Sequence, residues 1–340
     1  MIGLGHLQRC LSLAVVLNTH HIDSLFLVNQ SSNSFERIAS RGFTSNALVA
    51  TESWMADDAA ETLEFASQQR CNAIVVDSHD VGIDYLTSLQ ERGCLIIVRD
   101  DLAENSFPCQ MLFNGNADAL RLPYKLYSDD TKFLLGPEYI VLPPEFDGLA
   151  DPARPTVDTV KTALVTLGGT DGYNLMPRLI NLMDELPGNF SITAVVGPFF
   201  SNIKAVQNAA ETARRRVRLV QAPKSLHELM SEADLAVSAA GQTLYELAYM
   251  GCPTVALSVA SNQRGQLEAL AEAGVVSTAG DAEEDNLLES VGGALLPLLS
   301  NAQSRAAMTT AAQAMVDGNG GKRVASEISA QISELPNRQL

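Results

Sequence analysis

The chain begins with Met1-Ile2-Gly3-Leu4-Gly5-His6-Leu7-Gln8-Arg9-Cys10. Gly3 and Gly5 permit a tight backbone path with positive φ, which larger side chains would obstruct. Apolar residues follow at helical spacing from Leu7 to Val15, so a helix is expected directly behind the glycines. A glycine loop at a helix N-terminus can bind anions, and His6 at that point can exchange a proton near neutral pH. On these residues alone, a histidine that only caps the helix is an equally good interpretation.

Only Met1 and Ile2 precede this loop. In a doubly wound α/β fold such a loop follows the first strand of the sheet, and a strand needs about five residues. We therefore expect the first strand of the N-terminal domain to be missing, which would leave the loop around His6 poorly anchored.

Composition limits the class of protein. A length of 340 residues suggests two domains, and 46% hydrophobic with 19% charged residues is typical of a globular protein. No apolar run is long enough for a membrane span, and no secretory leader is present, so a cytoplasmic protein without stable membrane insertion is expected. The net charge of -17 argues against nucleic acid as a partner, although a small anionic ligand can still bind through local N–H groups.

The cysteines and histidines give no sign of a metal site. The five cysteines are scattered without a CxxC pair, which favours free thiols, and the five histidines show no metal-binding spacing. We expect no metal and no cofactor, and a chain that acts as a monomer on a small-molecule substrate.

Short apolar runs alternate with helical segments, which is typical of βαβ units and a parallel sheet. In the first half we expect strands at 22–28, 47–50, 72–77 and 94–98, and helices at 34–41, 55–70 and 85–92. In the second half we expect strands at 162–167, 192–196, 217–220, 235–238, 254–257 and 275–278.

A proline-rich and acidic segment between Leu142 and Pro155 separates the two halves and resembles an interdomain linker. We therefore expect an N-terminal Rossmann-like domain at 1–145 and a C-terminal one at 156–320. A final helix at 321–340 could pack back on the N-terminal domain. Two such domains should face each other across a cleft, with ligands outside the carboxyl ends of the strands.

Two glycine-containing loops of the second half are candidates for phosphate binding. Gly168-Gly169-Thr170 follows the first strand, although an ordinary turn capped by Thr or Asp is the commoner explanation of such a loop taken alone. Ala240-Gly241-Gln242-Thr243 also follows a strand, and its small residues allow a diphosphate to approach N–H groups at a helix start. Glu246 lies one turn further along, where its carboxylate could accept both hydroxyls of a ribose. A solvated glutamate on an amphipathic helix is the alternative.

Two further strand ends carry polar side chains. Asn262 and Gln263 offer uncharged donors and acceptors that suit sugar hydroxyls, or Asn262 simply caps a helix. Asp77-Ser78-His79 ends a strand of the first half, and its carboxylate and imidazole either face the cleft or cap the next helix.

Together these motifs resemble the UDP-2,4-diacetamido-2,4,6-trideoxy-β-L-altropyranose hydrolases of pseudaminic acid biosynthesis, and more distantly the glycosyltransferases of the glycosyltransferase-B fold. The resemblance covers nearly the whole chain. It is carried by the segments Gly3–Cys10, Val75–Asp77, Leu135–Tyr139, Pro144–Phe146, Gly168–Asp171, Ala240–Glu246, Gly251–Pro253, Asn262–Gln263 and Asp317–Val324. The chain departs from the family in lacking a full strand before the glycine loop. It also reads Asp77-Ser78-His79 where the family tends to have Asp-His-Tyr.

The resemblance implies a glycosyltransferase-B fold and a role for each motif. His6 would be the general base that takes a proton from water, which attacks the anomeric carbon of a UDP-sugar with inversion. The substrate-binding residues would be Gly5, Arg9, Asp77, His79, Asn262 and Gln263. The nucleotide-binding residues would be Gly168, Gly169, Thr170, Ala240, Gly241, Gln242, Thr243 and Glu246. A glycosyltransferase with the same donor site and a nucleotide-sugar-binding protein without catalysis are the alternatives.

Overall fold

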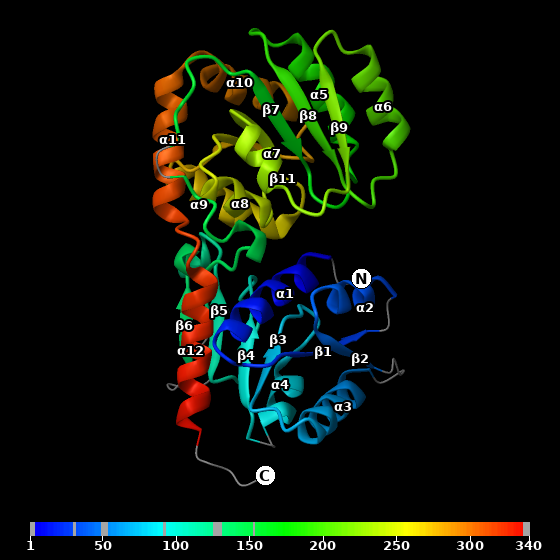
Figure 1. Ribbon diagram of the computed structural model, residues 1–340, viewed down its shortest axis with the longest axis vertical. Helices are drawn as coiled ribbons and strands as arrows, with labels where there is room; N and C mark the ends of the chain where they lie inside the picture. The colour runs from blue at the N-terminus through cyan, green and yellow to red at the C-terminus, as the bar shows by residue number, and fades with distance from the viewer. Residues whose placement is uncertain are drawn as a thin grey trace. The chain divides into compact units, whose positions relative to one another are not determined.

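The computed structural model describes residues 4–29, 32–48, 54–90, 93–124, 131–151 and 154–335. Contacts within the chain define two compact units (Figure 1). Unit 1 consists of residues 1–144 together with 319–340, and unit 2 consists of residues 145–318.

Unit 2 contains one six-stranded parallel sheet in the order β9-β8-β7-β10-β11-β12. Its strands are β7 (Thr162–Thr166), β8 (Ser191–Val196), β9 (Val217–Gln221), β10 (Leu235–Ala239), β11 (Thr254–Ser258) and β12 (Ser277–Asp281). Its helices are α5 (Leu175–Glu185), α6 (Ile203–Thr212), α7 (His227–Glu232), α8 (Thr243–Tyr249), α9 (Arg264–Glu272), α10 (Leu287–Ser300) and α11 (Ala302–Met315). Numbered from β7, this is the order 3-2-1-4-5-6 of a dinucleotide-binding domain.

The strands of this sheet form because their apolar runs can be buried on both faces, as parallel sheets require. Every residue of β10 and β11 is buried. The order in which strands are added reverses between β7 and β10. A ligand is expected beyond the carboxyl ends of these two strands.

The strands of unit 1 form two separate parallel sheets. One contains β1 (Leu25–Asn29) and β2 (Thr44–Leu48). The other contains β3 (Ala73–Val76), β4 (Leu95–Arg99), β5 (Met111–Asn114) and β6 (Lys132–Leu135), in that order. The helices are α1 (Leu4–Thr19), α2 (Ser32–Ser40), α3 (Trp54–Gln68), α4 (Ile83–Gln90) and α12 (Gly320–Glu334). Among the described residues, no strand precedes α1 and no pairing joins β1 to β3.

The break between the two sheets leaves the inner strands partly unburied. β4 and β5 are buried throughout, whereas Leu25 of β1 is 39% exposed and Val75 of β3 is 37% exposed. Since the first strand of a doubly wound sheet lies near its centre, this break occurs where the strand expected before the glycine loop would pair.

The last helix, α12, belongs to unit 1 and packs against α1 (Figure 1). Val324, Ala325 and Ile328 share a hydrophobic cluster with Leu13 and Leu17 of α1. A Cβ on Gly320 would lie 2.2 Å from the carbonyl oxygen of Ile140, so only glycine allows this approach. These contacts join the C-terminal helix α12 to the N-terminal part of unit 1.

The structure corrects several of the elements expected from the sequence. α1 already includes Gly5, whose φ is not positive, so the expected turn at Gly5 is wrong; Gly3 lies outside the described residues. β12 begins at Ser277 rather than Val275, because the Val275 N–H closes the end of α9 by donating to Leu270 after the positive-φ Gly274. β5 and β6 were not expected, because among the described residues no α-helix lies between β4 and β6 and the alternation of strands with helices is absent there.

Adding a strand in front of α1 should stabilise unit 1. We expect five apolar, β-branched residues placed before Met1 to pair with the open edges of β1 and β3 and to raise the melting temperature by about 2 °C or more. Thermal unfolding followed by circular dichroism measures this. A five-residue Gly/Ser extension is the control, and equal melting temperatures for the two extended chains would contradict the account of the sheet.

Candidate active site

A cluster of charged and imidazole side chains lies in unit 1 where α1 begins and where β3 and β4 end. His6 and Arg9 share one face of α1, because residues three apart are neighbours on a helix. Asp77 directly follows β3, and Asp101 follows β4. Since β3 and β4 are parallel neighbours, their carboxyl ends meet at one edge of the sheet.

Asp77 is the centre of this cluster. Its side chain is 3% exposed and accepts from Arg9 Nε at 2.6 Å, from Arg9 Nη2 and from the Cys10 thiol at 3.3 Å. His6 Nδ1 lies 2.9 Å from Asp77 Oδ1. Burial alone would raise the pKa of Asp77, but the hydrogen bonds from Arg9 and His6 outweigh burial and hold it well below its usual value. Asp77 is therefore an ionised carboxylate in this site.

The contact with Asp77 determines which nitrogen of His6 carries the proton. Nδ1 lies 2.9 Å from both Asp77 Oδ1 and Arg9 Nη2. An unprotonated Nδ1 would set its lone pair against an anionic oxygen, whereas a protonated Nδ1 donates to it, and the charge-assisted bond is the stronger one. The Nε2 lone pair is therefore available to accept a proton.

Asp101 forms a second pair beside the first. Its Oδ1 lies 2.6 Å from His79 Nε2, and its Oδ2 accepts from Arg99 Nη1 at 2.7 Å. Arg9 Nη1 also approaches Asp101 at 3.5 Å and so connects the two carboxylates. The rings of His6 and His79 meet edge to face, with 4.8 Å between their centroids.

The sequence analysis singled out His6, Arg9, Asp77 and His79, and the structure brings all four together. It did not single out Arg99 and Asp101. The signal that could have found them is the charged run Arg99-Asp100-Asp101 at the end of the buried strand 94–98. Gly5 lies one residue before His6 in the first turn of α1, and it is exposed.

The glycine loops of unit 2 lie at the carboxyl ends of neighbouring strands. Gly168, Gly169 and Thr170 follow β7 and are exposed. The segment Ala240–Thr243 follows β10, the next strand in the sheet. Gly168 has φ of +84°, and a Cβ on Gly197 would lie 2.3 Å from the Gly168 carbonyl oxygen, so this close-packed loop needs glycine on both sides.

Asp171 caps α5, which was one of the two interpretations of this loop from the sequence. Its two carboxylate oxygens accept from the N–H groups of Leu175 and Met176, at 2.7 and 2.9 Å. The loop 168–170 thus leads into a firmly capped α5, while the exposed Thr170 takes no part in the cap.

Glu246 differs from every carboxylate described above. It is 8% exposed, and within the described chain no hydrogen bond or ion pair to its carboxylate is present. Burial, and secondly the negative charge of Glu145, raise the pKa of Glu246 to about 7. The alternative of a solvated surface glutamate is therefore wrong, and the carboxylate lacks a partner among the described residues.

The helix that carries Glu246 is short. α8 begins at Thr243 and has seven residues, so Gly241 and Gln242 precede it. Because so short a helix has a small dipole, the N–H groups of the loop and Glu246 itself are the stronger candidates for ligand contacts.

Asn262 and Gln263 belong to a short 3-10 turn, Ser261–Gln263, which follows β11. The Gln263 side-chain oxygen accepts from the Val259 N–H at 2.9 Å, and its Nε2 lies 3.8 Å from where a Gly241 Cβ would be. The sequence analysis did not single out Gln266, which is buried and joins Tyr245 to the Ala240 carbonyl. Gln266 therefore holds the loop after β10 in place. It belongs to no motif from which this role could have been predicted.

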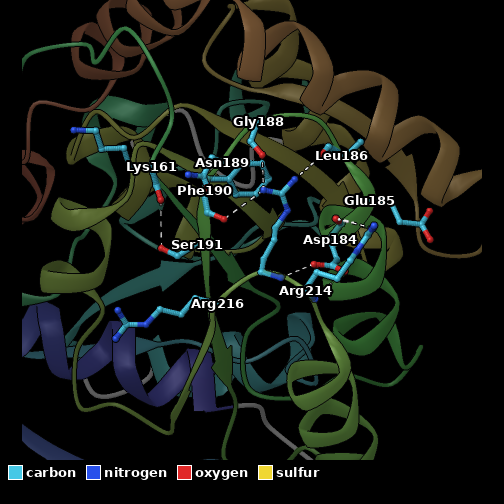
Figure 2. Close-up of a pocket in the computed structure, with 11 residues that line it drawn as sticks. Lys161, Asp184, Glu185, Leu186, Gly188, Asn189, Phe190, Ser191, Arg214 and Arg216 are labelled. Atoms are coloured by element: carbon cyan, nitrogen blue, oxygen red, sulfur yellow. Dashed lines mark hydrogen bonds and ion pairs between the residues drawn. The ribbon is translucent and has the colours of Figure 1, made fainter.

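Figure 2 shows a surface pocket of about 580 Å³ at the opposite edge of the same sheet. Lys161 precedes β7, Ser191 begins β8 and Arg216 precedes β9, so the pocket lies at the amino ends of these strands. Arg215 is held there by the carbonyl groups of residues 183, 186 and 188 and by the Phe190 ring. In this pocket Arg215 joins the segment before β9 to the end of α5 and the loop that follows it. The pocket is therefore separate from the candidate nucleotide site.

Among the described residues, no group of three or more His, Cys, Asp or Glu side chains could hold a metal ion. No helix in the part of the chain that the structure describes is long and apolar enough to cross a membrane.

The chain is similar to solved structures along nearly its whole length. Acinetobacter baumannii MurG aligns with a TM-score of 0.70, at 15% identity over 96% of this chain and 97% of that one. A structure titled putative UDP-N-acetylglucosamine 2-epimerase from Listeria monocytogenes gives a TM-score of 0.69, at 15% identity over 98% and 95% of the two chains. The chain has an α/β fold of the glycosyltransferase-B type.

Curated relatives are distant, and no protein-family model matches the chain. "Spore coat polysaccharide biosynthesis protein SpsG" of Bacillus subtilis is 25% identical over 57% of this chain and 57% of its own length. "Pseudaminic acid cytidylyltransferase and UDP-2,4-diacetamido-2,4,6-trideoxy-beta-L-altropyranose hydrolase" of Helicobacter pylori is 24% identical over 77% of this chain and 43% of its own length. The chain spans about half the length of the curated relatives that it matches.

Replacement of Glu246 by glutamine should stabilise the protein at alkaline pH. Between the ordinary pKa of 4.5 and the folded pKa of about 7, the folded state keeps a proton that the unfolded chain releases, so stability falls as pH rises through this range. Glutamine cannot ionise, and Glu246→Gln should be more stable than the wild type by up to about 3 kcal/mol at pH 8 but by under about 1 kcal/mol at pH 5.

Urea unfolding at the two pH values measures this difference. Glu268→Gln changes an exposed glutamate of α9 and serves as the control, with no pH-dependent gain. A gain for Glu246→Gln that is the same at pH 5 and pH 8 would show that the carboxylate is not buried as described.

Proposed function

We propose that the chain is a nucleotide-sugar hydrolase that releases UDP from a UDP-linked acetamido- or diacetamido-deoxy sugar. In this proposal it acts in the biosynthesis of a nonulosonic acid such as pseudaminic acid, or of a surface polysaccharide. The observation that carries the proposal is the His6–Asp77 pair, which leaves His6 Nε2 free to accept a proton. The names of the Helicobacter pylori and Bacillus subtilis relatives support the substrate class.

His6 is the general base of the proposed reaction. A water oxygen attacks the anomeric carbon, the bond from that carbon to the diphosphate breaks, and its electron pair leaves with UDP. One proton of the water passes to His6 Nε2, and the configuration at the anomeric carbon is inverted. Asp77 stays ionised because Arg9 and His6 hold its pKa low, and it stabilises the imidazolium that forms.

Unit 2 supplies the nucleotide contacts in this proposal. The N–H groups of the loops 168–170 and 240–243 bind the diphosphate and stabilise its growing charge. Glu246 accepts the two ribose hydroxyls, which provides its buried carboxylate with the partners that it lacks. Asn262 and Gln263 contact the sugar or a phosphate, and Gly5, Arg9 and His79 border the sugar on unit 1.

A glycosyltransferase is the second candidate, because the same base could take the proton of an acceptor hydroxyl. UDP release in buffer without an acceptor distinguishes the hydrolase from the transferase. Binding of UDP-sugars without turnover, with or without an acceptor, would mark a nucleotide-sugar-binding protein instead.

His6→Asn should lower kcat for UDP release by about 10²-fold or more, because the amide can still bond to Asp77 but lacks the base at Nε2. A panel of UDP-acetamido sugars, followed by a coupled assay for UDP, measures this. UDP affinity by calorimetry should be nearly unchanged.

His21→Asn is the matched control. His21 is an exposed histidine beyond the far end of α1, about 20 Å along the helix from His6. Its φ of 59° is one that asparagine adopts readily. Equal turnover for His6→Asn and His21→Asn would remove His6 from the mechanism.

Glu246→Ala should weaken UDP binding by about 1.5–3 kcal/mol, the range for hydrogen bonds to a charged group. The same variant should bind 2′,3′-dideoxy-UDP nearly as well as the wild type does, because that ligand has no hydroxyls for Glu246. Calorimetry with both ligands gives the two losses, with Glu268→Ala as the control. Equal losses for UDP and its dideoxy analogue would rule out the ribose contact.

A further inference from the structure

The active-site cluster contains two imidazoles that are held in the same way. His6 presents Nδ1 to Asp77, and His79 presents Nε2 to Asp101. Each carboxylate is also bonded to a guanidinium, Asp77 to that of Arg9 and Asp101 to that of Arg99. The proposed mechanism gives a chemical task to His6 only.

The charged groups of the cluster balance one another. Two ionised carboxylates, Asp77 and Asp101, face two guanidiniums, Arg9 and Arg99, so the four charges cancel. For Asp101, as for Asp77, the pull of burial towards a higher pKa is outweighed by its cations, chiefly Arg99 and Arg9, which keep its pKa below its usual value. Both carboxylates are therefore acceptors for the imidazole that each one meets.

His79 as an acceptor has a single ring proton, which lies on the nitrogen that meets the Asp101 carboxylate. Nε2 donates to Asp101 Oδ1 across 2.6 Å, which leaves the lone pair on Nδ1. The side chains of His79 and His6 are 30% and 17% exposed, so a ligand can reach both rings. Two hydrogen-bond acceptors, His6 Nε2 and His79 Nδ1, therefore belong to rings whose centroids are 4.8 Å apart.

We propose that His79 is a second catalytic residue, which accepts a hydrogen bond from the nucleophilic water while His6 accepts the proton that is removed. This inference rests on the proposed hydrolase function. Water offers two protons to two acceptors, and the two rings are neighbours, with centroids 4.8 Å apart, so one water can lie between them. An acceptor hydroxyl offers only one proton, so the pair suits water better than the nucleophile of a glycosyltransferase.

Held at both protons, the water directs a lone pair of its oxygen away from the two rings and towards the anomeric carbon. When the carbon–oxygen bond forms, His6 Nε2 takes one proton and the electron pair of the broken bond leaves with UDP. The second proton stays on the new hydroxyl group of the sugar, still bonded to His79 Nδ1 until the product departs. His79 thus orients the nucleophile and gains no proton itself.

Two substitutions of His79 separate this role from a structural one. In His79→Gln the amide nitrogen can reach the place of Nε2 and still donate to Asp101, but the acceptor at Nδ1 is lost. In His79→Asn the amide oxygen replaces Nδ1 as an acceptor, but the bond to Asp101 is lost. A structural role predicts that the glutamine variant is the more active one, and our inference predicts the reverse.

We expect His79→Gln to lower kcat for UDP release by about ten- to a hundredfold with little change in KM or in UDP affinity. His79→Asn should keep most of the activity. The double variant His6→Asn/His79→Gln should be no slower than His6→Asn alone, because both residues act on one water. His21→Gln, at the exposed histidine, is the control and should match the wild type.

The pH profile gives an independent readout. The charged groups around His79 are Arg9 and the titratable His6 on α1, Asp77 after β3, and Arg99 with Asp101 at the end of β4. Both imidazoles must be neutral to accept from water, so log(kcat/KM) should fall with slope 2 on the acid side for the wild type. The slope should be 1 for His79→Asn.

The outcomes separate the two proposals. A wild type that releases no UDP from any UDP-sugar overturns the hydrolase function and the water-binding role with it. A wild type that hydrolyses a UDP-sugar while His79→Gln equals it, or exceeds His79→Asn, overturns the role of His79 alone.

Discussion

The buried carboxylate of Asp77 is the constraint on which the site in unit 1 depends. A carboxylate that is 3% exposed remains charged only when cations and donors surround it. Here α1 supplies the side chains in contact with it, His6, Arg9 and Cys10, and Arg99 of β4 adds a second positive charge nearby. The requirement fixes the rotation of α1 over the end of β3. It also fixes the proton of His6 on Nδ1, so the same set of bonds that compensates the burial of Asp77 orients the imidazole that we propose as the base.

Glu246 represents the opposite case, a buried carboxylate without compensation. Its raised pKa means that the fold loses stability whenever the group ionises near neutral pH. Such a loss is typical of functional sites, where a group is kept ready for a ligand rather than satisfied internally. The two carboxylates therefore differ in their partners: Asp77 is bonded within the protein, whereas the Glu246 carboxylate has no hydrogen bond or ion pair among the described residues.

The elements that could be predicted from the sequence are those with one dominant signal. Buried parallel strands such as β10 and β11 are continuous apolar runs, and their strand-end loops follow from the sheet order. Asp101 and Arg99 could not be assigned to the site, because their partners His79 and Arg9 are distant in sequence and meet them only through the pairing of β3 with β4. The turn predicted at Gly5 was wrong, because glycine is as compatible with the first turn of a helix as with a loop.

Charge balance connects the local chemistry to the composition of the chain. A protein with a net charge of -17 repels a diphosphate at long range, so the site must avoid adding negative charge of its own. Arg9 and Arg99 achieve this by cancelling the charges of Asp77 and Asp101. In the proposed reaction His6 takes a proton from water, and the cluster becomes positive as the leaving diphosphate becomes more negative. The proposed reaction thus produces its attractive charge in the transition state rather than in the resting enzyme, where it would favour substrate binding without accelerating the reaction.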